Sequence, residues 1–176
     1  MRLVFHRDFH NRENGSRLKK KNHHHVLTTE SRVMHGFSYR SDAMLDLVAY
    51  IDGGSLGNPG PSGIGVVIEG SAEGKIRIAK WIGRQDNNVA EYVALLEAIQ
   101  YALALKAEAL HVYSDSEVVV RQMIGEYTCR SPRLYSLNWI CRKLARSFNF
   151  SISHVRREDN TEANDLACSV LRGELS

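Results

Sequence analysis

The sequence predicts an α/β fold in which five strands form one mixed sheet flanked by helices. Short apolar runs bounded by glycine and proline alternate with longer segments of helical periodicity. The first three runs follow one another through short turns, as in an antiparallel meander, whereas helical segments separate the later runs, as parallel strands require. With 176 residues, 43% of them hydrophobic and 24% charged, the chain suits a single globular domain with a tail.

The meander is expected at residues 47–52, 63–69 and 75–82, with 70–74 as the hairpin turn before its third strand. The first run ends at Asp52, and a turn rich in glycine and proline follows at once. A buried carboxylate is costly unless it is paired or holds a metal, although aspartate is also common as the first residue of a turn. Asp52 is therefore either a turn residue or a functional acid.

A long helix is expected over residues 89–105, with Asn88 as its N-cap and Glu91 completing a capping box. Its apolar positions recur at helical spacing: Tyr92, Leu95, Leu96, Ile99 and Leu103. A strand over 109–113 ends at Ser114-Asp115-Ser116, and a short helix follows over 117–124.

A further helix begins at Ser131-Pro132, since proline favours the first helical position. Its expected buried stripe is Leu134, Leu137, Ile140, Cys141 and Leu144. The last strand is expected over 148–155, and Asn160 is the expected N-cap of the last helix. The core face of that helix is expected to be Ala163, Leu166, Ala167, Val170 and Leu171. In sheets of this kind, ligands gather at the carboxyl ends of the parallel strands.

The positive charge of the chain is concentrated before this domain. The net charge is +5 over residues 1–45 and −2 over the remainder, and six of the eight histidines lie in 1–44. Low hydrophobicity and high charge favour disorder in 1–44. This extension is interpreted as a basic arm for nucleic acid, a metal-capturing histidine run, a targeting segment or a stretch outside the working protein. Residues 174–176 are a short C-terminal tail.

Three cysteines without a close Cys-x-x-Cys pair indicate small buried side chains in a reducing compartment, and not a disulfide framework or zinc site. No apolar run is long enough to span a membrane, and the first ten residues lack a signal-peptide core. We therefore expect a cytoplasmic protein.

Four acids stand near the ends of predicted elements: Asp52, Glu91, Asp115 and Asp165. Each has a structural alternative, because Asp115 suits an N-cap, Glu91 a capping box and Asp165 the positive end of a helix dipole. Together, four carboxylates without a histidine or cysteine partner suit a hard divalent cation such as Mg²⁺. Two such ions about 4 Å apart can clamp the attacking and leaving oxygens of a phosphodiester.

Four stretches of the sequence occur in the order typical of one family: IDGGSLGNPGPSGIGVV, DNNVAEYVALLEAI, VYSDSE and HVRREDNTEANDLA. On these motifs the chain resembles type 1 ribonucleases H of the RNase H-like superfamily, in its short archaeal and plant-like branch. The resemblance covers residues 45–173 as one domain and implies the RNase H-like fold. It also implies two Mg²⁺ ions, with Mn²⁺ as a substitute.

The resemblance assigns roles to individual residues. Asp52 would bridge both ions, and Glu91, Asp115 and Asp165 would complete the ligand set. The Gly54 backbone and Glu91 would lie near RNA 2′-hydroxyl groups. Three asparagines match residues that contact the hybrid backbone, unless they serve only as turn and cap residues: Asn58, Asn87 and Asn88.

The chain departs from the family pattern at three places. Asp86 stands where threonine is frequent, which puts a contact with a DNA phosphate in doubt. The loop 125–130 is short and lacks the basic protrusion of several bacterial members. The loop before Asp165 lacks the family's histidine; Arg157, next to Arg156, is the expected stand-in, and His154 is expected to be a structural residue.

The resemblance implies a metal-dependent endonuclease that cleaves the RNA strand of RNA–DNA hybrids and leaves 5′-phosphate and 3′-hydroxyl ends. A nuclease for double-stranded RNA and a non-catalytic nucleic-acid-binding module are the alternatives. We expect a monomer that recognises the hybrid through its backbone and shape, with no membrane and no obligate protein partner.

Overall fold

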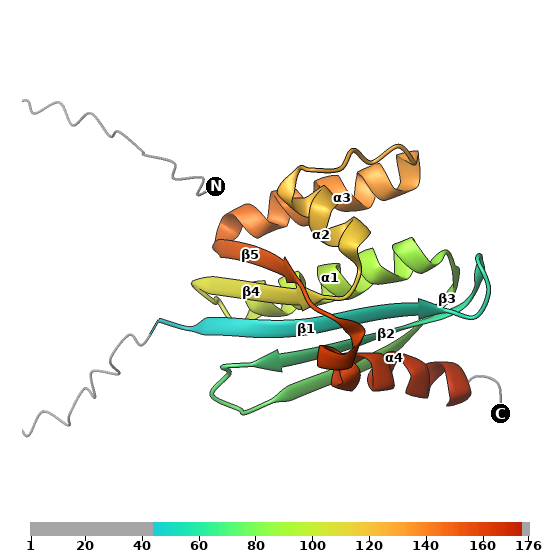
Figure 1. Ribbon diagram of the computed structural model, residues 1–176. Helices are drawn as coiled ribbons and strands as arrows, with labels where there is room; N and C mark the ends of the chain where they lie inside the picture. Colours follow the sequence, from blue (N-terminus) through green and yellow to red (C-terminus); the bar gives the residue numbers. More distant parts are fainter. Residues whose placement is uncertain (1–43, 174–176) are drawn as a thin grey trace, which may run out of the picture. The chain divides into compact units, whose positions relative to one another are not determined.

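In the computed structural model, residues 44–173 are described, and they form one five-stranded sheet with helices on both faces (Figure 1). The strands are β1 (Asp46–Ser55), β2 (Gly60–Glu69), β3 (Ile76–Gln85), β4 (Ala109–Ser114) and β5 (Asn149–His154). Their order in the sheet is β3-β2-β1-β4-β5, with the first three antiparallel and with β4 and β5 parallel to β1. The predicted mixed sheet and the predicted order of elements are confirmed.

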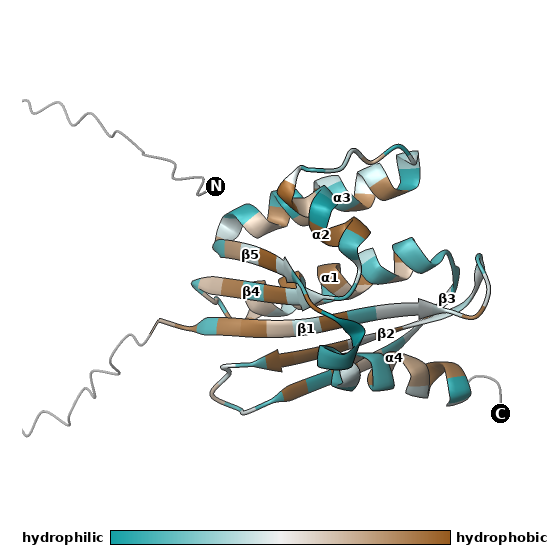
Figure 2. Ribbon diagram, in the orientation of Figure 1, coloured by the Kyte–Doolittle hydropathy of each residue, from teal (hydrophilic) through white to brown (hydrophobic). Residues whose placement is uncertain are grey.

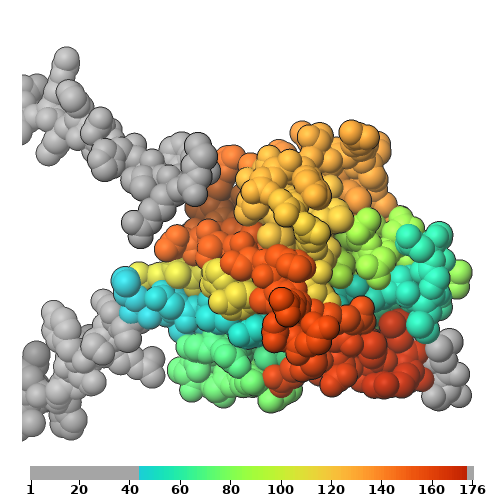
Figure 3. All heavy atoms as spheres, in the orientation of Figure 1, coloured from blue at the N-terminus to red at the C-terminus, as the bar shows by residue number. Residues whose placement is uncertain are grey.

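Four α-helices connect and follow the strands: α1 (Asn87–Ala104), α2 (Glu117–Ile124), α3 (Pro132–Leu144) and α4 (Thr161–Gly173). Two single 3₁₀ turns, η1 (Ala145–Ser147) and η2 (Arg157–Asp159), precede β5 and α4. In the space-filling view, the segment from β5 through η2 into α4 lies at the front of the domain (Figure 3). None of the helices in the described range is both long and apolar enough to cross a bilayer.

Adjacent glycines on β1 face opposite sides of the sheet and so identify its two layers. A Cβ on Gly53 would lie 2.2 Å from the backbone carbonyl carbon of Ala90 in α1, whereas a Cβ on Gly54 would face Leu171 in α4. Because successive strand residues point to opposite faces, α1 covers one face and α4 the other.

Glycine is required where each of these helices approaches the sheet most closely. The Gly53 contact with α1 leaves no room for a side chain, and a Cβ on Gly65 of β2 would lie 2.0 Å from the Ala163 carbonyl oxygen in α4. These approaches bring the residues that follow, Glu91 and Asn164, next to β1.

The hydrophobic core lies mainly between the sheet and α1, and Figure 2 shows apolar residues along the middle of the strands. Tyr92 is fully buried in this layer. Its hydroxyl donates to Gln122 Oε1 at 2.8 Å and accepts from Asn138 Nδ2 at 3.0 Å, so that α1, α2 and α3 are linked by satisfied polar groups.

Two sequence expectations are wrong in detail. Ile140, expected in the buried stripe of α3, is 38% exposed. Asn88 is not the N-cap of α1, because the helix begins two residues earlier than expected, at Asn87 after Asp86. Asn160 directly precedes α4 as expected, but its side chain is turned toward the sheet, where its Nδ2 donates to the Ile51 carbonyl oxygen at 2.8 Å. The expectations for 1–43 and for the tail 174–176 lie outside the described residues.

Candidate active site

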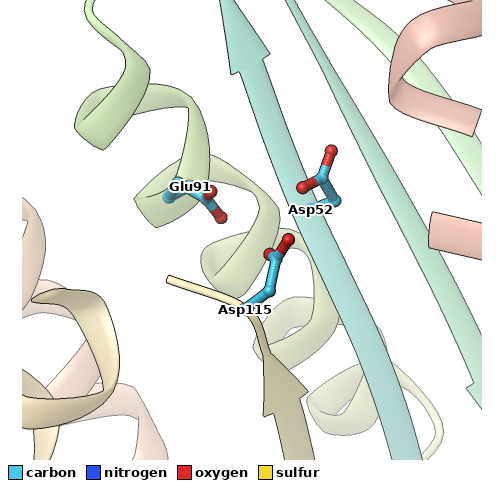
Figure 4. A group of neighbouring side chains, drawn as sticks. All are labelled: Asp52, Glu91 and Asp115. Carbon is cyan, nitrogen blue, oxygen red and sulfur yellow. The ribbon is translucent and has the colours of Figure 1, made fainter. Parts of the chain in front are cut away.

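Three carboxylates converge at the carboxyl ends of the parallel strands β1 and β4. Asp52 comes from β1, Glu91 from α1 and Asp115 from the residue after β4, and one oxygen of each lies within 4.8 Å of the others. Figure 4 shows the three side chains directed toward one another from these elements. The sequence prediction that these acids meet agrees with this arrangement.

The structural alternatives for two of these acids are excluded. Ser116 is the N-cap of α2, and its side chain accepts from the Val119 N–H, so Asp115 is not needed for capping. Glu91 is the fifth residue of α1, beyond the first turn, and it does not form the predicted capping box with Asn88.

Two of the three acids are buried, and one of their oxygens lacks a hydrogen-bond partner. Asp52 is 4% exposed and Glu91 5% exposed, and Glu91 Oε2 is buried without a hydrogen-bond partner. The Gly53 N–H donates to the Glu91 carboxylate. An acid buried with one free oxygen is unfavourable unless a cation or a proton compensates its charge.

Burial and mutual repulsion raise the pKa values of this cluster. Burial, followed by the charge of Asp115, raises the pKa of Asp52 from 3.8 to about 6, while Arg157 acts in the opposite direction. Burial, followed by the charges of Asp52 and Asp115, raises the pKa of Glu91 well above its ordinary value. The folded protein therefore holds these carboxylates at a free-energy cost that a bound divalent cation would relieve.

Asp165, predicted as the fourth carboxylate, does not join the cluster. It is exposed on α4, whereas the preceding residue, Asn164, lines the surface cleft that contains the three carboxylates. The Asn164 Nδ2 atom lies 3.4 Å from Asp52 Oδ2. One residue on a helix is a rotation of about 100°, so a shift of one position exchanges the face that meets the sheet. The expectation of four converging acids is corrected to three acids and an amide.

Two further polar residues beside the carboxylate cluster were missed as site residues. Asn160 Nδ2, which bonds the Ile51 carbonyl, also lies 3.4 Å from Asp115 Oδ1. The Cys168 thiol donates to Asn164 Oδ1 at 3.8 Å from the next turn of α4. The spacing of Asn160, Asn164 and Cys168, four residues apart, was the signal in the sequence that marks one face of this segment.

Arg157 lies at the rim of the same cleft, at the start of η2. Its side chain is exposed, and its charge lowers the pKa values of Asp52 and Glu91. This position agrees with the predicted place of Arg157, while His154 is exposed and does not line the cleft. The catalytic role of Arg157 stays a prediction.

The predicted nucleic-acid contacts divide into two groups. Gly54 and Asn87 line the cleft, whose volume is about 330 Å³. Asn58 is exposed, and its Oδ1 accepts from the Asn87 N–H at 3.1 Å, so the β1–β2 turn is tied to the start of α1. Asn88 does not line the cleft, and its predicted contact stays untested.

The donor set fits a hard divalent cation. Among the described residues that line the cleft, it offers carboxylate oxygens and no imidazole, while the Cys168 thiol is bonded to the amide oxygen of Asn164. The buried oxygen of Glu91 without a hydrogen-bond partner is available as a ligand.

Comparisons with known proteins agree with this geometry. A family model described as reverse transcriptase-like matches residues 50–170. The crystal structure of an RNase H1 from Halobacterium salinarum has a TM-score of 0.69 and 35% identity, and the match covers 73% of this chain and 98% of that one. This chain belongs to the type 1 ribonuclease H family.

Other relatives place the family domain in longer proteins. The curated ribonuclease HI of H. salinarum is 36% identical over 70% of this chain and 63% of its own length. A bifunctional protein of Mycobacterium tuberculosis is 37% identical over 70% of this chain and 35% of its own length. The chain thus matches less than two thirds of either curated relative. The structure of LC11-RNase H1 in complex with an RNA/DNA hybrid has a TM-score of 0.68 and 34% identity, with 74% of this chain and all of that one covered.

Proposed function

We propose that this ribonuclease H family member is a metal-dependent endonuclease that hydrolyses the RNA strand of RNA–DNA hybrids. The observation that carries the proposal is the convergence of Asp52, Glu91 and Asp115, of which the first two are buried, with one Glu91 oxygen lacking a partner. Support for the substrate comes from the LC11-RNase H1 relative, whose structure holds an RNA/DNA hybrid.

Asp52, Glu91 and Asp115 would hold the divalent cations, Mg²⁺ with Mn²⁺ as a substitute. Two ions bound there would supply an activated water and stabilise the charge on the phosphodiester, giving 5′-phosphate and 3′-hydroxyl products. Asp52, on the central strand β1, is the proposed bridging ligand. Arg157, on the rim, would hold the scissile phosphate through paired hydrogen bonds, because arginine stays charged and presents a planar donor fork.

Asn164 takes the position proposed for the fourth ligand from α4, in place of Asp165. Its amide oxygen is able to bind Mg²⁺ but brings no charge, so we infer a weaker second site than four carboxylates would give. Its Nδ2 would orient Asp52 through the contact at 3.4 Å.

The backbone of Gly54, together with Glu91, would meet 2′-hydroxyl groups, and Asn58, Asn87 and Asn88 would meet the hybrid backbone. Because the Asn87 N–H donates to Asn58 Oδ1, the two residues lie together and would contact the same nucleic-acid strand. Segment 1–44 would add affinity that does not depend on nucleic-acid sequence, through its basic residues. We propose that the protein acts as a monomer in the cytoplasm.

The experiment that tests this function is cleavage of matched RNA–DNA, RNA–RNA and DNA–DNA duplexes over a titration of Mg²⁺ and of Mn²⁺. We expect cleavage of the RNA strand of the RNA–DNA hybrid and of no other strand or duplex. EDTA should abolish this cleavage. Cleavage of RNA–RNA at an equal rate would reassign the substrate to double-stranded RNA, and DNA cleavage would overturn the proposal.

A non-catalytic nucleic-acid-binding module is the second candidate. The observation in its favour is the amide of Asn164 at the position where a fourth carboxylate was expected. Binding of the hybrid without cleavage in either metal would select this candidate over the enzyme.

A further inference from the structure

The outward face of α3 carries an exposed aromatic pair and a group of cations that the cleft does not use. Tyr135 is 59% exposed and Trp139 is 54% exposed. Arg142, Lys143 and Arg146 are also exposed, and the spacing of the five residues places them along one side of the helix and of η1. These five residues are called the α3 face.

The side chains of the α3 face border hollows on the surface. One hollow of about 300 Å³ is lined by Tyr135, Asn138, Trp139, Arg142, Lys143 and Arg146. A second hollow of about 340 Å³ lies beside the same two aromatic residues, with Ser136 and Ile140. Lys143 Nζ lies 4.9 Å from the centre of the Trp139 ring, a cation–π distance, so a cation accompanies the ring.

The cations of this face lack acidic partners. Within residues 44–173, no carboxylate lies within 4 Å of Arg142, Lys143 or Arg146. By contrast, Lys75 and Arg121 each pair with two glutamates. The sequence from 127 to 157 has seven Lys/Arg and no Asp or Glu, so the α3 face keeps an uncompensated positive charge.

The exposed aromatic residues are not needed to pack α3. The other side of the helix meets the core through the buried Cys141 and through Leu134, Leu137 and Leu144, which pack against the core. A large exposed aromatic side chain is free to contact a partner, and base rings stack on such side chains while adjacent cations bind phosphates.

We propose that the α3 face is a binding site for single-stranded nucleic acid, separate from the cleft. Bases stack on Trp139 and Tyr135, and Arg142, Lys143 and Arg146 contact the phosphates. The charge of the face complements a polyanion, and its two rings with flanking hollows suit flat, unpaired bases. The site goes beyond the proposed function, because none of its residues lines the cleft and its binding needs no metal.

The test uses the full chain in EDTA, so that cleavage does not interfere. The chain has two tryptophans, Trp81 and Trp139, so Trp81→Phe leaves Trp139 as the sole tryptophan, whose emission is recorded with excitation beyond the tyrosine absorption band. Titration with an oligothymidylate of about 12 nucleotides, within the length that one small binding face covers, should quench the Trp139 emission. Added salt should reverse the quenching.

A matched pair of variants separates the α3 face from the basic segment 1–44. Trp139→Ala/Arg142→Ala removes one tryptophan and one arginine of the face, and Trp81→Ala/Arg84→Ala removes the same residue types from β3. By fluorescence anisotropy of labelled oligothymidylate, the first variant should bind roughly five- to a hundredfold more weakly, and the second should bind like wild type.

Unquenched Trp139 emission, or equal weakening in both variants, would overturn the proposal. Quenching by vesicles of anionic phospholipid but not by the oligonucleotide would also overturn it and assign the face to a membrane surface. Circular dichroism of both variants checks folding; if Trp139→Ala/Arg142→Ala fails to fold, Lys143→Ser/Arg146→Ser supplies the same comparison at exposed positions.

Discussion

The two sides of the cleft are held in different ways. On the side of β1 and α1, Asp52 and Glu91 are almost completely buried, and Gly53 allows the helix to pack directly on the strand. On the side of η2 and α4, Arg157 is exposed and Asn164 is only partly buried. Burying the two carboxylates costs folding free energy, and a bound cation would offset that cost. Substitutions on the exposed side should change the free energy of unfolding little.

The largest effect is expected from the buried side. Asp52→Asn should lower single-turnover cleavage of the hybrid by more than roughly a thousandfold, because the proposed bridging charge is lost. The variant should remain folded and, without metal, unfold at a higher denaturant concentration than wild type, since one repelling charge is gone. Near-normal cleavage in Mg²⁺ would remove Asp52 from the metal site.

A substitution on the exposed side, at Arg157, should reduce cleavage less than Asp52→Asn does. Arg157→Ala should reduce turnover by roughly ten- to a thousandfold, in line with the loss of one charged contact in the transition state. Arg157→Lys should restore only part of the rate, because lysine lacks the planar fork. Metal affinity should change little in either variant.

Single-turnover cleavage at saturating Mg²⁺, with Arg156→Ala as the neighbouring control, measures this difference. Equal rates for wild type, Arg157→Ala and Arg157→Lys would show that Arg157 is only a solvated loop residue without a role in cleavage.

Two adjacent residues of α4, Asn164 in the cleft and the exposed Asp165, test the same difference between the two sides. Asn164→Asp should lower the Mg²⁺ concentration needed for half-maximal cleavage by up to about tenfold, because it adds a charged oxygen ligand beside Asp52. Without metal the same variant should be less stable, since a fourth acid joins three that already repel one another.

Asp165→Asn is the matched control at the exposed neighbour, where stability should change by less than about 0.5 kcal/mol. Metal titrations of activity and urea denaturation in EDTA measure both variants. A larger effect from Asp165→Asn than from Asn164→Asp would restore the original assignment of Asp165.

A last effect is a pH dependence of the metal-free protein. The pKa of Asp52 is 3.8 ordinarily and about 6 in the fold, so the folded state holds its proton more tightly. This group therefore favours folding most below about pH 4, and that contribution is lost as pH rises through about 6, a difference of about 2–3 kcal/mol.

Urea denaturation of wild type and Asp52→Asn in EDTA from pH 4 to 7 measures the contribution of Asp52 to the free energy of unfolding. Wild type should lose stability relative to the variant over that window. A constant difference across it would show that the Asp52 pKa is not raised.

The sequence was most informative where burial constrains the residues. The alternation of strands and helices predicted the mixed sheet, and Asp52 stood out because an acid ended a buried apolar run. Asp115 and Glu91 followed from the same reasoning about element ends, since carboxyl ends of parallel strands share one edge.

The α4 side was mispredicted because its first turn offers little hydrophobic constraint. Asn164 and Asp165 are adjacent polar residues, and no feature of the sequence pattern decides which of them faces the sheet. That orientation depends on the packing of Ala163 and Ala167 against Gly65 and Gly63, a tertiary contact. On α3, Ile140 was wrongly assigned to the buried stripe, whereas Leu134, Leu137, Cys141 and Leu144 do pack on the core.

The central claim is that the buried carboxylates bind divalent cations, and calorimetric titration of Mn²⁺ or Mg²⁺ into nucleic-acid-free protein tests it most directly. Wild type should bind the metal and release protons near pH 6, because raised pKa values leave carboxyl protons to be displaced. Glu91→Gln should lose most of this binding while keeping its fold by circular dichroism. An identical binding curve for wild type and Glu91→Gln would contradict the account, because the metal would then lie elsewhere.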